Sequence, residues 1–174
     1  DHCVTGVQTC ALPIYIKNLQ KQLVVAYKNN DIKLLFSLQE KLMMSFEGRA
    51  LAVRRIVSND GSTTPGLDKI IWNSPKAKFQ AILELREILV RKPGNYQAGP
   101  VRRTWIPKDQ SDELRPLGIP NMIDRGLQAL TLMCLDPIVE ELSDVYSFGF
   151  RKYRNTGNAI QRIRTILDKS NGPR

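Results

Sequence analysis

Lys108 and Arg115 lie on either side of the polar turn in the segment IPKDQSDELRPLGIP. Apolar residues run up to this turn and away from it, which predicts an antiparallel hairpin with the two cations close across its strands. Neighbouring cations repel each other unless an anion lies between them. That anion is either a ligand, such as a phosphate, or an acidic residue of the turn, which offers Asp109, Asp112 and Glu113.

Few other residues could carry out catalysis. The single histidine is His2, and the chain contains no Cys/His metal cluster, no GxSxG nucleophile turn and no GxxxxGK[ST] phosphate loop. Glu140 and Glu141 are adjacent on a predicted helix, where consecutive side chains point to different faces. We therefore predict no catalytic residue and no metal site in this chain, and a function that depends on binding.

Charge is the unusual property of the composition. The 174 residues carry a formal net charge of +9, although the hydrophobic share of 42% and the charged share of 25% are those of a globular protein. An excess of lysine and arginine either keeps the surface soluble or binds a polyanion by releasing its counterions. No apolar run approaches the roughly 20 residues that a membrane-spanning helix needs.

The first fourteen residues differ in kind from the rest. The string VTGVQTCALPI, residues 4–14, resembles the in-frame translation of a common DNA-sequencing adapter, and it lacks the basic start of a secretory signal. We therefore interpret residues 1–14 as an artefact and expect a protein that is not secreted. Cys3 and Cys10 belong to this segment, which leaves Cys134 without a partner for a disulfide.

Hydrophobic spacing and turn residues predict helices around one hairpin. Apolar residues recur at helical spacing in six segments, which are residues 15–30, 32–46, 48–59, 75–91, 121–142 and 157–169. Residues 101–107 and 114–120 have the pattern of two paired strands, and Asp31 is placed to cap the second helix. The order predicts an α+β fold, mainly helical with a small antiparallel hairpin.

Basic residues alternate with aromatic ones in several segments. Arg102 and Arg103 precede Trp105, and Arg151 follows Phe150. Such mixtures suit a nucleic acid, because cations pair with phosphates and rings stack on bases. Each residue also has a plain structural explanation, since a helical arginine is usually solvated and a tryptophan is more often part of the core.

The segment RRTWIPKDQSDELRPLGIPNMIDRGLQAL, residues 102–130, closely resembles the fingers region of group II intron reverse transcriptases. Residues 50–68 and 135–163 resemble neighbouring blocks of that family in the same order. Two departures lie in the last block, where Phe148 replaces the usual Tyr and Lys152-Tyr153 replaces the usual Pro-Gly.

The resemblance implies a fold, an activity and partners. Residues 15–59 would form a helical N-terminal extension that binds RNA, and residues 60–174 the fingers and the start of the palm of a right-hand polymerase. The implied activity is RNA-directed DNA synthesis by an intron-encoded reverse transcriptase and maturase. Its partners would be group II intron RNA, template RNA, primer DNA and dNTP, in the bacterial cytoplasm or an organelle.

The resemblance also implies site residues. Lys108 and Arg115 would contact the triphosphate of the incoming dNTP, which explains why two cations flank the turn. Gly118 would let the backbone approach the templating base, and Arg125 would hold the template or the adjacent framework. Contacts with RNA or template are implied for Arg49, Arg54, Arg55, Arg102, Arg103, Gly118, Ile119, Pro120, Arg125 and Arg151.

Metal chemistry in this family depends on palm aspartates that hold Mg²⁺, one pair of them in a Tyr-Ala-Asp-Asp turn. The chain contains no such tetrapeptide, and no aspartate follows Asp168. We therefore expect Mg²⁺ only in a full-length parent, and a truncated fragment that is inactive alone. One alternative is a non-catalytic RNA-binding maturase module that assists intron splicing, and another is a basic domain whose resemblance is coincidental.

Overall fold

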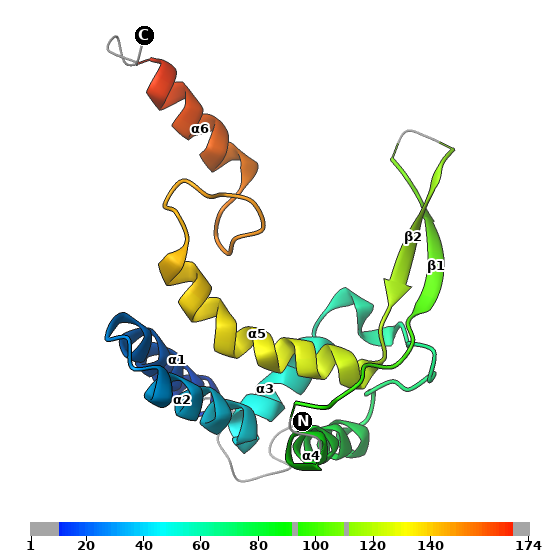
Figure 1. Cartoon of the computed structure of the whole chain (residues 1–174). Coiled ribbons are helices and arrows are strands. Elements are labelled where there is room, and N and C mark those ends of the chain that lie inside the picture. Colours follow the sequence, from blue (N-terminus) through cyan, green and yellow to red (C-terminus); the bar gives the residue numbers. More distant parts are fainter. Residues whose placement is uncertain (1–10, 92–93, 110–111, 169–174) are drawn as a thin grey trace. The chain divides into compact units, whose positions relative to one another are not determined.

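The computed structural model of the protein describes residues 11–91, 94–109 and 112–168. Its elements, in chain order, are α1 Ala11–Lys28, α2 Ile32–Met44, α3 Phe46–Val57, the 3₁₀ helix η1 Asp60–Thr63, α4 Pro75–Arg91, β1 Arg102–Pro107, β2 Leu114–Ile119, α5 Met122–Leu142 and α6 Thr156–Leu167 (Figure 1). This order confirms the predicted α+β class. The chain divides into two compact units, and the division falls between Ile138 and Val139 in the sequence of α5.

The core of the first unit is built from the apolar faces of its helices. In α1, Ile16, Leu19 and Leu23 recur at helical spacing, and each is at most 3% exposed. α1 packs against α2 and α3, and α3 packs against α4. Burying a large apolar side chain contributes roughly 1.5–3 kcal/mol. The most completely buried of these come from α1, α2, α4 and α5, and they are Leu23, Leu42, Leu85, Met122 and Leu130.

Polar side chains set the starts of α2 and α3. The Leu34 N–H donates to Asp31 Oδ1 at 3.0 Å, which confirms Asp31 as the cap of α2. The Gly48 N–H donates to Ser45 Oγ at 3.0 Å, so Ser45 caps α3. α3 therefore begins at Phe46, two residues before the predicted start.

Helix α1 begins at Ala11, earlier than the predicted start at Tyr15. Residues 11–14 belong to the adapter-like string, yet they continue the helix, and residues 4–10 lie outside the described residues. The origin of the string stays a prediction, because a helical conformation says nothing about how the DNA arose.

The two strands form a hairpin that projects from the helical part of the first unit, with α5 starting at its base (Figure 1). The register places Ile106 opposite Arg115. Because side chains alternate along a strand, Arg115 shares a face with Ile106 and Lys108. Arg103 and Trp105 lie on the opposite face.

Arg49 of α3 is buried, with 4% of its surface exposed. Its Nη1–H donates to the Ile82 carbonyl of α4 at 2.7 Å, and its Nε–H donates to the Ser45 carbonyl at 3.1 Å. Burial lowers the pKa of the guanidinium, and the hydrogen bonds offset part of the cost of removing the charge from water. The predicted RNA contact of Arg49 is therefore corrected, because this side chain joins α3 to α4 inside the fold.

Replacing Arg49 by alanine should destabilise the first unit strongly, since buried carbonyl groups would lose their donors and a cavity would open. Hydrogen bonds to a charged group contribute roughly 1.5–3 kcal/mol, so we expect urea unfolding to show a loss of at least about 2 kcal/mol. Arg54→Ala, on the exposed side of the same helix, should change the unfolding free energy by less than about 0.5 kcal/mol. Equal losses in both variants would contradict the structural assignment of Arg49.

Candidate nucleic-acid interface

One face of the hairpin carries both cations that flank the turn. Lys108 follows the last residue of β1, and its N–H donates to the Glu113 carbonyl at 3.0 Å, which extends the strand pairing by one residue. Lys108 Nζ lies 2.5 Å from Glu113 Oε2, with both side chains largely exposed. Of the three acidic residues in the turn, Glu113 is therefore the one that forms an ion pair with Lys108. Arg115 is exposed on the same face.

The opposite face of the hairpin exposes a tryptophan. Trp105 is 54% exposed and lies across from Pro116, with the exposed Arg103 two residues away on the same face. The sequence left both a core position and a stacking position open for this ring, and the two-stranded hairpin leaves its outer side in contact with water. Trp105 and Arg103 are therefore accessible for stacking and for phosphate pairing.

Three predicted residues at the root of the hairpin differ in exposure. Gly118 is exposed, and a Cβ at this position would lie 3.2 Å from Val101 Cγ2, so the glycine leaves room for that side chain. Ile119 is 9% exposed and Pro120 is partly buried. A framework role suits Ile119 better than a direct contact with RNA.

Arg125 ties the start of α5 to the loop around η1. Its Nε–H donates to the Pro120 carbonyl at 3.0 Å, its Nη1–H to Gly61 at 3.0 Å, and its Nη2–H to Thr64 at 2.7 Å. Burial lowers its pKa, and the positive charge of Arg102 acts in the same direction. Of the two roles implied by the resemblance, these contacts support the framework role.

A groove of about 370 Å³ lies beside this arginine, between α3 and α5. It brings Arg55 beside Pro120 and Arg125, which come much later in the sequence, and all three were predicted to contact RNA. Asn59 and Gln128 add polar groups to the lining. A cationic groove with amide donors can hold a phosphodiester backbone. The remaining lining residues are Ile56, Ala129 and Leu132.

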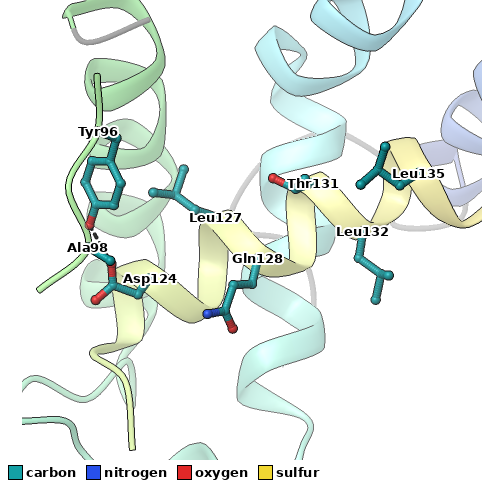
Figure 2. Close-up of a pocket in the computed structure, with 8 residues that line it drawn as sticks. All are labelled: Tyr96, Ala98, Asp124, Leu127, Gln128, Thr131, Leu132 and Leu135. Carbon is teal, nitrogen blue, oxygen red and sulfur yellow. Dashed lines mark hydrogen bonds between the residues drawn. The ribbon is translucent and has the colours of Figure 1, made fainter. Parts of the chain in front are cut away.

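A second groove, of about 390 Å³, lies along another side of α5 (Figure 2). Its walls are mainly apolar, and Figure 2 shows Leu127, Leu132 and Leu135 spaced along the helix. At one end the Tyr96 hydroxyl donates to Asp124 Oδ1 at 2.7 Å. Burial and this bond raise the pKa of the tyrosine. The sequence prediction missed this groove, although an aspartate in the first turn of an apolar helix was a visible signal.

Arg151 belongs to the second unit, where its side chain is bound internally. Its Nε–H donates to Glu140 Oε2 at 3.0 Å, its Nη1–H donates to the Asp144 carbonyl at 3.2 Å, and 9% of the side chain is exposed. The hydrogen bond from the Arg151 side chain lowers the pKa of Glu140. The RNA contact predicted for Arg151 is therefore corrected, since its guanidinium holds the turn after α5. Arg154 also approaches Glu140, at 3.5 Å.

Groups for metal or covalent chemistry are scarce in the described part of the chain. Within residues 11–91, 94–109 and 112–168, no three His, Cys, Asp or Glu side chains are placed to hold a metal ion. Cys134 is a free, buried thiol whose pKa is raised to about 11 by burial, so it stays protonated at neutral pH. Among the helices described, none is long and apolar enough to cross a membrane.

Residues 10–85 match the family described as the N-terminal domain of reverse transcriptase. The group II intron-encoded protein LtrA of Lactococcus lactis subsp. cremoris is 33% identical over 115 residues, which cover 66% of this chain and 18% of LtrA. These matches support a protein of the group II intron reverse transcriptase and maturase family. The match to the reverse transcriptase domain ends within α4, before the hairpin with Lys108 and Arg115.

Two further relatives of this chain come from other organisms. Protein YkfC of Escherichia coli (strain K12) is 35% identical over 153 residues, or 87% of this chain and 39% of YkfC. The COX1/OXI3 intron 1 protein of Saccharomyces cerevisiae is 29% identical over 130 residues, or 75% of this chain and 15% of that protein. The chain thus spans well under half the length of each of these relatives.

Arg55 gives the sharpest test of the groove. RNA affinity should fall with salt, with a log–log slope of roughly −0.7 for each phosphate neutralised on a single strand. Arg55→Ala should weaken binding and make this slope shallower by about one phosphate contact, as filter binding from low to moderate salt would show. Arg91→Ala, which removes an equal charge at the end of α4, should change both quantities less. An RNA affinity that does not change with salt, or equal losses of affinity in Arg55→Ala and Arg91→Ala, would refute the groove as an RNA site.

Proposed function

We propose that this chain binds template RNA and incoming dNTP, as the N-terminal and fingers part of an RNA-directed DNA polymerase. The observation that carries the proposal is the placement of Lys108 and Arg115 on one face of an exposed hairpin in a reverse transcriptase family chain. A triphosphate is long enough and charged enough to engage both cations. Arginine adds a planar, bidentate contact that lysine does not offer.

The RNA side of the proposal rests on a different set of residues. Arg55 and Arg125 line one groove, and Arg54 is exposed on the same helix as Arg55. Trp105 and Arg103 on the outer face of the hairpin offer a ring and a cation to an unpaired strand. Intron RNA and template RNA share the phosphate backbone that such residues recognise, so both are proposed as partners.

The residues described do not fit the Mg²⁺ that DNA synthesis in this family requires, because they offer no group of three carboxylates or other ligands. This chain alone should therefore show no primer extension with Mg²⁺ and all four dNTPs. Template-dependent extension by a sample purified free of host polymerase would overturn this expectation.

A second candidate function is that of an RNA-binding module that assists intron splicing without DNA synthesis. The groove favours it, because Arg55 and Asn59 can engage RNA there whatever the hairpin binds. The two functions differ in their need for nucleotide. Substituting the hairpin cations and the groove residues separately, and testing each variant in a splicing assay, would distinguish the two functions. The splicing module needs only the groove.

The hairpin assignment predicts a selective loss of nucleotide affinity. Arg115→Ala should weaken dNTP binding about tenfold to a hundredfold, because a hydrogen bond to a charged group contributes roughly 1.5–3 kcal/mol. The dNTP affinity of Arg115→Lys should lie between those of Arg115→Ala and the wild type, because the positive charge stays while the planar, bidentate guanidinium is lost. Calorimetric titration of the full chain with dTTP at low salt would measure these affinities.

The matched control is Arg103→Ala, which removes the same group from the other face of the hairpin. It should leave dTTP affinity unchanged, and Arg115→Ala should leave RNA affinity and the melting temperature unchanged. If Arg115→Ala lowered the melting temperature but not the dTTP affinity, the residue would be structural and the nucleotide assignment would fail.

A further inference from the structure

Glu113 is placed beside both cations of the proposed nucleotide site. It lies directly across from Lys108, because the strand pairing continues through the bond from the Lys108 N–H to the Glu113 carbonyl at 3.0 Å. It precedes Arg115 by two residues, which puts the two side chains on one face. Its Oε2 is 2.5 Å from Lys108 Nζ. The protein therefore carries its own anion at the position where a phosphate would have to bind.

The ion pair is too exposed to hold the hairpin together. The Lys108 side chain is 47% exposed and that of Glu113 is 72% exposed, and pairs in such surroundings stabilise a fold only slightly. The backbone bonds of the hairpin persist without it. Breaking the pair is thus easy, yet a phosphate can use Lys108 fully only after the carboxylate has moved away.

We propose that Glu113 is a specificity-determining residue that competes with the nucleotide phosphates for Lys108. The inference rests on the proposed function of the hairpin. While the carboxylate is bound, the face carries the net charge of Arg115 alone, and weakly held anions are displaced. As a nucleotide dissociates, Glu113 replaces the phosphate on Lys108, which speeds its release and shortens the residence time. The hairpin is thereby set to bind and release nucleotide repeatedly instead of retaining it.

Glu113→Gln should therefore tighten the binding of dTTP about two- to fivefold, the range that exposed ion pairs span. Most of the gain should come from slower dissociation. Asp112→Asn removes an equal charge one residue away and leaves the Lys108–Glu113 pair intact, so it should have a smaller effect. Calorimetry and stopped-flow dissociation on the full chain would measure both, with a melting curve to confirm folding.

A double-mutant cycle separates competition from simple repulsion. If Glu113 acts by occupying Lys108, then Glu113→Gln should lose most of its effect in a Lys108→Ala background. An equal gain in both backgrounds, or no gain in the wild-type background, would overturn the inference. Failure of the nucleotide site itself has another signature, because Lys108→Ala and Arg115→Ala would then leave dTTP affinity unchanged.

Discussion

The guanidinium of Arg125 is the contact on which the candidate site depends. It donates to the carbonyls of Pro120, Gly61 and Thr64, and so joins the root of the hairpin to the loop around η1. A second contact joins the same loop to the start of α5, because Asn121 Oδ1 accepts a hydrogen bond from the Leu67 N–H at 3.0 Å.

Gly66 makes that approach possible. A Cβ at this position would lie 2.3 Å from Asn121 Oδ1 and 2.6 Å from its Cα, closer than atoms can pack. The loop therefore comes against the start of α5 only because this residue has no side chain. The position of the hairpin root and that of the basic groove are thus fixed by one framework within the first unit.

Arginines in this chain divide into two groups by their surroundings. Arg49, Arg125 and Arg151 donate to carbonyl and carboxylate groups of the fold. Arg55, Arg103 and Arg115 are exposed. A guanidinium that is saturated internally has little left for a phosphate. The strongly positive charge of the sequence therefore overstates the number of residues available for RNA.

Much of the fold could be predicted from the sequence, because apolar spacing and capping residues act locally. Asp31 and the paired strands around the turn are examples. The burial of Arg49 could not be predicted, since it depends on a carbonyl of α4 that lies 33 residues away. The role of Glu140 was hidden for the same reason, because its arginine partners come after a turn whose path local sequence does not define.

The site itself was predicted mainly through the family resemblance. Residues alone left two sources open for the anion beside Lys108, and the structure supplies one of them, Glu113. The groove that gathers Arg55 and Arg125 required the packing of α3 beside α5, which no local pattern encodes.

If the hairpin face with Lys108 and Arg115 receives the triphosphate, titration of the ¹⁵N-labelled chain with dTTP should shift the amide signals of this face. We expect saturable chemical-shift changes concentrated at Lys108, Glu113 and Arg115, with little change at Arg49 in the core. Shifts that spread evenly over the basic surface, or that spare the hairpin, would contradict this placement of the triphosphate.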